Sequence, residues 1–153
     1  MIITTYLRGN VDRVWDAIQL KKFDLFHSPQ EIADIFVCDL DQYSRTYQGE
    51  YRSDLAQQFA STSDQLHSLY RPFMDGFITP EAMVANVKAT YRAKAKLLRE
   101  FRRKTTNIDH LTASLLGLGV IESVYKTPDV RLAEALKIAK PRLKPLIERL
   151  EKQ

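Results

Sequence analysis

The sequence has little cysteine, glycine or proline and no long apolar run. Of its 153 residues, one is cysteine (Cys38), five are glycine and six are proline. A lone cysteine cannot form a disulfide within the chain, and secreted domains of this size usually carry an even set, so a reducing, cytoplasmic environment is predicted. The longest nearly apolar stretch, Leu115–Ile121, is far shorter than the roughly 20 residues that span a membrane. We therefore expect no membrane contact.

The motifs of common enzyme and metal sites are also missing. There is no HExxH or CxxC motif, and Gly117 and Gly119 lack the preceding strand and the further glycine or lysine of a nucleotide-binding loop. His27 precedes a predicted helix cap, His67 falls off the apolar stripe of its helix, and His110 stands at a helix start. All three are predicted to be surface or capping residues. The protein is accordingly predicted not to be an enzyme and to hold no cofactor and no metal.

One helix face concentrates acidic side chains beside the cysteine. Its residues are Glu31, Asp34, Cys38 and Asp41. Their spacing places them along one side of a helix. A single side cannot surround a cation, so we predict a solvent-exposed acidic face rather than a metal site. A small enzyme built on this face is a distant alternative.

Helix signals dominate the remainder of the sequence. Three Ser/Thr-Pro pairs, Ser28-Pro29, Thr79-Pro80 and Thr127-Pro128, mark helix starts, because the hydroxyl can cap the helix and proline is tolerated in its first turn. Glu31, three residues after Ser28, completes a capping box. The sequence therefore predicts a mainly α-helical bundle of about five to seven helices.

The apolar spacing gives approximate helix ranges. The predicted helices cover residues 10–23, 28–49, 50–70, 79–104 and 108–116, and a last one begins at residue 127. Apolar residues from Tyr51 to Phe73 step by three or four, as in a coiled-coil seam, so that helix is expected to continue through Ser61–Asp64. Pro141 and Pro145 are predicted to divide the last segment into short turns or to kink its helix.

The N-terminus has a different character. Residues 1–9 are predicted to form an extended arm or strand, because Met1–Leu7 is rich in β-branched and aromatic residues. A strand needs a partner, which is either Val120–Tyr125, the other strand-like stretch, or another chain in a homo-oligomer. Residues 10–153 are predicted to form a single helical domain.

Charge is distributed unevenly along the chain. Residues 1–85 carry a net charge of −5 and residues 86–153 a net charge of +9. The helical domain therefore has an acidic half, residues 10–85, and a basic half, residues 86–153. Such asymmetry favours a surface that faces a polyanion. Alternatively, the two halves attract each other and pack together.

Basic residues are densest between Lys88 and Lys104, where eight lysines and arginines accompany one acid, Glu100. At 100° per residue, five of them form a stripe about 80° wide on the flank of the apolar helix face. This stripe consists of Lys88, Arg92, Lys96, Arg99 and Arg103. Like charges one turn apart repel by a few tenths of a kcal/mol per pair, and a polyanion would offset that cost.

These patterns together predict a non-enzymatic helical accessory protein that binds nucleic acid through its basic helical face. Contacts of this type go to phosphates and give affinity without reading base sequence. The alternative is a protein–protein adaptor or assembly subunit with no nucleic-acid contact, docking through the apolar seam of residues 51–73 or through the N-terminal arm. Its basic surface would then face an acidic protein partner.

Overall fold

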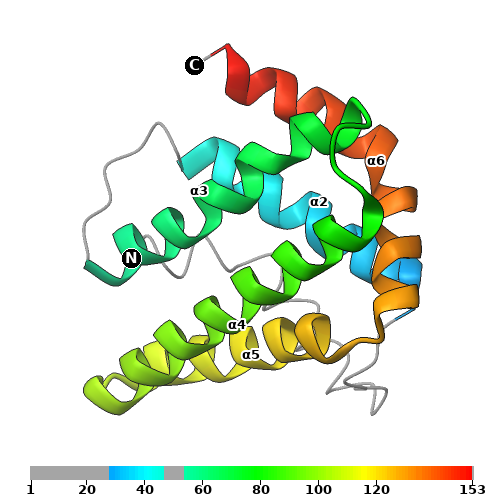
Figure 1. Cartoon of the computed structure of the whole chain (residues 1–153). Coiled ribbons are helices and arrows are strands. Elements are labelled where there is room, and N and C mark those ends of the chain that lie inside the picture. Colours follow the sequence, from blue (N-terminus) through cyan, green and yellow to red (C-terminus); the bar gives the residue numbers. More distant parts are fainter. Residues whose placement is uncertain (1–27, 47–53, 153) are drawn as a thin grey trace.

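The computed structural model describes residues 28–46 and 54–152, which form a bundle of α-helices (Figure 1). The helices are α2 (Pro29–Thr46), α3 (Asp54–Met74), α4 (Pro80–Lys104), α5 (Ile108–Lys126) and α6 (Asp129–Glu151). α2 packs along α6, and α4 packs against both α3 and α5. The predicted mainly α-helical bundle is confirmed. The strand expected within residues 1–9 and the helix expected over 10–23 lie outside the described residues.

Two predicted helix starts are confirmed by their caps. The backbone N–H of Glu31 donates to Ser28 Oγ (3.2 Å) and the Ser28 hydroxyl donates to Glu31 Oε1 (2.9 Å). The backbone N–H of Ala82 donates to Thr79 Oγ1 (3.2 Å), and Pro80 follows the cap directly. These bonds satisfy N–H groups that have no partner within the helix.

Helix α3 continues through Ser61–Asp64 without a break, as the seam predicted. Three seam residues, Phe59, Leu66 and Phe73, are buried in the core. The helix ends at Met74, and Gly76 follows in the left-handed region with a φ of +83°, a conformation that glycine adopts at little cost. Since these three side chains pack inside the bundle, they are not available as a docking surface for a partner.

The prediction for residues 108–126 is wrong in two respects. α5 does not end near Gly117 but continues to Lys126, and Val120–Tyr125 is helical rather than a strand. Each glycine inside a helix costs about 1 kcal/mol relative to alanine. Burial of Leu118, Ile121 and Val124 against the rest of the bundle outweighs that cost. Helix α5 is apolar on several sides, so its sequence lacks the one-sided pattern that marks a surface helix.

The last segment is one continuous helix, α6, despite Pro141 and Pro145. Proline removes a backbone hydrogen bond and crowds the preceding turn. Both prolines are exposed, on the side of the helix where water can reach the carbonyl groups that lose a partner. The division into short turns is therefore wrong for this segment.

One hydrophobic core joins all five helices. Its fully buried side chains include Phe36 of α2, Phe59 of α3, Val87 of α4, Ile121 of α5 and Leu136 of α6. None of the helices in the described part of the chain is both long and apolar enough to cross a membrane.

Candidate functional site

The five residues of the predicted basic stripe lie along one flank of α4. Arg92, Lys96, Arg99 and Arg103 are exposed and Lys88 is half-buried. Two further cations at the end of the helix, Arg102 and Lys104, are also exposed. We call the stripe and these two cations, which lie on opposite sides of the stripe in the last turn of the helix, the basic α4 face. The stripe pattern did not include Arg102 and Lys104, although both fall within the dense basic segment.

Three cations of the basic α4 face form ion pairs, two with neighbouring helices and one within α4. Lys88 forms an ion pair with Asp129 of α6, and Arg99 forms one with Glu122 of α5. Arg103 pairs with Glu100 at 2.5 Å, one turn earlier on α4. These carboxylates belong to the basic half of the chain. In the described part of the chain, the stripe is thus not paired with the acidic half.

Tyr125 of α5 contacts two arginines of this face. The Arg92 guanidinium lies over its ring, 5.7 Å from the centroid, and Arg99 donates a hydrogen bond to its hydroxyl at 3.1 Å. Arginine over an aromatic face gains cation–π attraction, typically about 0.5–1 kcal/mol at an exposed site. The two guanidinium groups are therefore positioned by α5.

A groove of about 710 Å³ runs beside the basic α4 face, between α3 and α4. Lys96 and Lys104 line it together with the partly buried Leu97 and Phe101. Its α3 side carries polar Gln58 and Thr62. The groove thus combines two cations and one carboxylate, Glu100, with an apolar surface.

Lys94 is the exception among the basic residues of α4. It is only 1% exposed, and its Nζ lies 3.2 and 3.3 Å from the two carboxylate oxygens of Asp39 on α2. The ammonium also lies over the rings of Phe59 and Tyr91, at 5.2 and 5.0 Å from their centroids. One of the eight cations of the segment therefore faces the core and contributes nothing to the surface.

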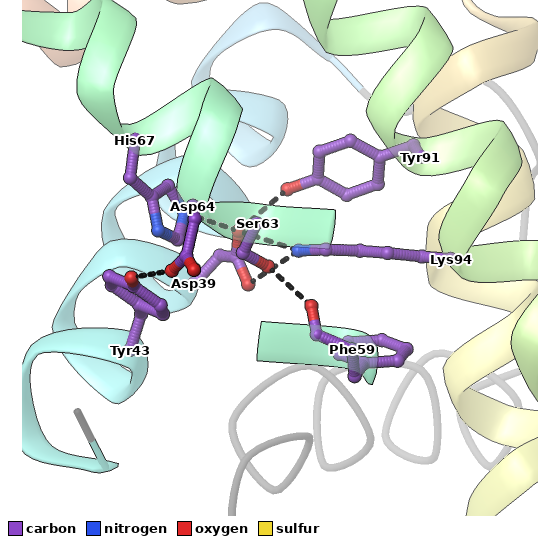
Figure 2. A network of polar contacts seen from close by, with 8 residues as sticks. All are labelled: Asp39, Tyr43, Phe59, Ser63, Asp64, His67, Tyr91 and Lys94. Atoms are coloured by element: carbon purple, nitrogen blue, oxygen red, sulfur yellow. Dashed lines mark hydrogen bonds and ion pairs between the residues drawn. The ribbon is translucent and has the colours of Figure 1, made fainter. Parts of the chain in front are cut away.

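Asp39 is the centre of a buried polar network (Figure 2). Its carboxylate accepts from Lys94 and, at 3.4 Å each, from the Tyr91 hydroxyl and from Nε2 of His67 on α3. The network joins α2, α3 and α4, helices that are distant in sequence. A buried carboxylate with three donors can remain charged at neutral pH.

Burial and partners have opposite effects on this carboxylate. Burial by itself raises the pKa of Asp39, but the charges and hydrogen bonds of Lys94 and His67 outweigh burial and hold it well below its usual value. For His67, burial has the largest effect and lowers its pKa from 6.5, although the hydrogen bond to Asp39 and the negative charge of Asp39 raise it. The ion pair therefore joins charged Lys94 and Asp39 beside a neutral imidazole.

The structure corrects the prediction for His67, which is 7% exposed rather than on the surface. The signal that would have found the network is helical spacing. Lys94 stands three residues after Tyr91 and four before Leu98, both of which are buried. Asp39 has the same spacing between Phe36 and Tyr43, which are also buried. Treating every polar residue as exposed hid these positions.

The other histidines differ from His67. His110 is half-buried, with its ring 5.8 Å from that of Phe101, and its backbone N–H donates to the capping Asn107. It therefore lies at a helix start, as predicted. His27 lies outside the described residues.

The acidic face of α2 is partly exposed to solvent, as predicted, but two of its carboxylates also contact α6. Asp34 pairs with Arg142 at 2.5 Å, and Asp41 pairs with Arg149 at 3.0 Å. Cys38, between them in sequence, is half-buried. Here the acidic and basic halves of the chain do attract each other. No cluster of three or more His, Cys, Asp or Glu side chains in the described ranges could hold a metal ion.

Lowering the pH from about 7 to 5 is expected to destabilise the protein through His67. Because its pKa in the fold lies below the value of 6.5 expected for the unfolded chain, the unfolded state takes up a proton first. The stabilisation is complete above that value, and the free energy of unfolding falls as the pH drops below it. The slope is at most about 1.4 kcal/mol per pH unit. Urea unfolding at several pH values measures it.

A pair of histidine variants isolates this effect. His67→Gln can still donate from its amide to Asp39 but cannot titrate, so its slope between pH 7 and 5 should be flatter than that of the parent. His110→Gln is the matched control, because it makes the same substitution at a half-buried histidine outside the Asp39 network. An unchanged slope in His67→Gln would contradict a neutral, buried His67.

Comparison of the chain with protein-family models, with curated proteins and with solved structures gives no significant match. The candidate sites therefore have to be interpreted from their own geometry and charge.

Proposed function

We propose that the protein binds nucleic acid through the basic α4 face, by contacts to the phosphate backbone. The observation that carries the proposal is the concentration of exposed cations along α4, with the five-residue stripe on one flank and Arg102 and Lys104 on either side of it. Lys96, Arg102 and Lys104 are exposed and form no ion pair with the described residues. Phosphate contacts of this kind supply affinity that is largely independent of base sequence.

The ion pairs on this face are compatible with phosphate binding. Arg99 and Arg103 are exposed, and an exposed ion pair contributes only about 0–1 kcal/mol. A guanidinium can exchange such a partner for a phosphate, to which it donates two parallel hydrogen bonds. The carboxylates of Glu122 and Glu100 reduce the local field and favour a moderate affinity.

The adaptor alternative loses part of one docking surface, because Phe59, Leu66 and Phe73 of the seam at residues 51–73 are buried in the core. An acidic protein could still contact the basic α4 face. The regular spacing of cations along one helix flank favours the repeating charge of a phosphate backbone over the irregular charge of a folded acidic partner.

The salt dependence of binding tests the proposal. If five cations of the face meet phosphates, log affinity against log salt should have a slope of about −4.5 for duplex and −3.5 for single strands. Arg92→Gln, Lys96→Gln and Arg103→Gln together should flatten the duplex slope by nearly three units, roughly 0.9 for each phosphate that is no longer neutralised. Fluorescence anisotropy with labelled oligonucleotides between 50 and 200 mM salt gives these slopes.

A second triple variant controls for net charge. Lys137, Lys144 and Lys152 are exposed and lie outside the basic α4 face, so their replacement by glutamine removes the same charge elsewhere. This control should keep the parent slope. Equal losses in the two triple variants, or binding by the α4 variant as tight as that of the parent, would refute the proposed surface.

A further inference from the structure

A second hollow of about 360 Å³ opens between α2, α3 and α6, away from the basic α4 face. Tyr43 of α2 and His67 of α3 line it on one side, and Ile147 and Leu150 of α6 supply an apolar wall. Its charged lining consists of Asp64, Arg71 and Glu151. The volume is that of a site for a small molecule.

The imidazole of His67 has a hydrogen-bonding atom that the fold leaves unused. Nε2 faces the Asp39 carboxylate, which can only accept, so Nε2 carries the hydrogen. In the neutral ring Nδ1 is then an acceptor, and it is buried without a hydrogen-bond partner among the described residues. Leaving a buried polar atom unpaired costs about 1–3 kcal/mol. The atom therefore favours a bound N–H or O–H donor.

The charges around the hollow favour a positive ligand. Arg71 is already engaged with Glu151, through hydrogen bonds of 3.1 and 2.5 Å. Asp64 accepts a hydrogen bond from the Tyr43 hydroxyl, and its carboxylate has further acceptor positions for another donor. Figure 2 shows Asp64, Tyr43 and His67 side by side. The lining thus carries one more negative than positive charge, and Tyr43, the donor to Asp64, packs against the His67 ring with the ring centroids 4.2 Å apart.

We propose that this hollow, the amine pocket, binds a small aliphatic amine. Its ammonium donates to Nδ1 of His67 and to the Asp64 carboxylate, and its alkyl chain packs on Ile147 and Leu150. An ammonium offers three donors and no acceptor, which matches a hollow whose lining includes two acceptors, Nδ1 of His67 and the Asp64 carboxylate. The site shares no residue with the basic α4 face and does not depend on nucleic-acid binding.

Butylamine, butyrate and butanol are matched probes, since they share one alkyl chain and differ in charge. We expect butylamine to shift the imidazole nitrogen resonances of His67 in the ¹⁵N-labelled full-length protein, in a saturable manner at neutral pH. His110 is the internal control and should not respond, because it does not line the pocket. Butyrate and butanol should leave both rings unchanged.

Two variants separate binding from general charge. Asp64→Asn should weaken butylamine binding roughly fivefold, the loss expected for a partly exposed ion pair. Glu134→Gln removes the same charge from an exposed position of α6 outside the pocket and should bind as the parent does. If Asp64→Asn lowers the melting temperature, Glu151→Gln, at the other carboxylate of the lining, provides the same comparison. The proposal fails if no probe shifts His67, if butyrate acts as strongly as butylamine, or if neither pocket variant weakens binding.

Discussion

Replacing Lys94 with methionine is expected to lower the free energy of unfolding by about 3–5 kcal/mol, the cost of leaving a buried carboxylate without its cation. Asp39 would keep only the weaker donors, His67 and the Tyr91 hydroxyl, each at 3.4 Å. Methionine fills nearly the same volume, so little of the loss comes from a cavity. For a chain of this length the melting temperature should fall by on the order of 10 °C. Urea unfolding and thermal melts measure both quantities.

Two further variants show whether the loss of stability comes from the buried ion pair. Lys88→Met removes a cation from the same helix, but its partner Asp129 is largely exposed, so the loss should stay below about 1 kcal/mol. Adding Asp39→Asn to Lys94→Met removes the unpaired charge and should recover most of the lost stability. A Lys94→Met protein as stable as Lys88→Met would contradict a charged, buried Lys94–Asp39 pair.

Phe36→Ala is expected to destabilise the protein by about 3–5 kcal/mol, because it removes a large side chain from a closed core. Phe36 is fully buried, and its ring lies edge-on to Tyr91 with the centroids 6.2 Å apart. The cavity would adjoin the helix that carries Lys94, so the buried network should also loosen. Denaturant unfolding gives the loss, and faster hydrogen exchange along α4 would report the loosening.

Phe77→Ala is the matched control for this substitution. Phe77 is 83% exposed, in the turn between α3 and α4, so removing its ring should change the free energy of unfolding by no more than about 0.5 kcal/mol. A loss at Phe77 comparable to that at Phe36 would mean that the Phe77 ring is covered in solution and would contradict its exposure in the fold.

Local signals predicted most of the helices correctly. Ser28 and Thr79 sit where a cap must sit, and the bonds that they accept involve residues three positions away, so sequence alone determines them. Periodic apolar residues likewise predicted α3 as one helix. The failures at Gly117 and Pro141 have a different cause. There the local cost of glycine or proline in a helix is real, but burial against other helices outweighs it. The free energy of that burial depends on residues distant in sequence, so a local sequence pattern does not show it.

The basic flank of α4 follows from helical spacing, so its position could be predicted, whereas the role of each cation on it could not. Lys94 and Lys96 are two residues apart and chemically identical, yet one is buried and the other exposed. Helical spacing turns Lys94 toward the core, a position that the sequence analysis did not assign to it, and only Asp39, 55 positions earlier in the chain, makes a buried ammonium tolerable. Sequence thus determined the helices, their caps and the charged flank. Tertiary structure decided which charges meet, because a buried charge is stable only beside a partner that the fold brings from elsewhere.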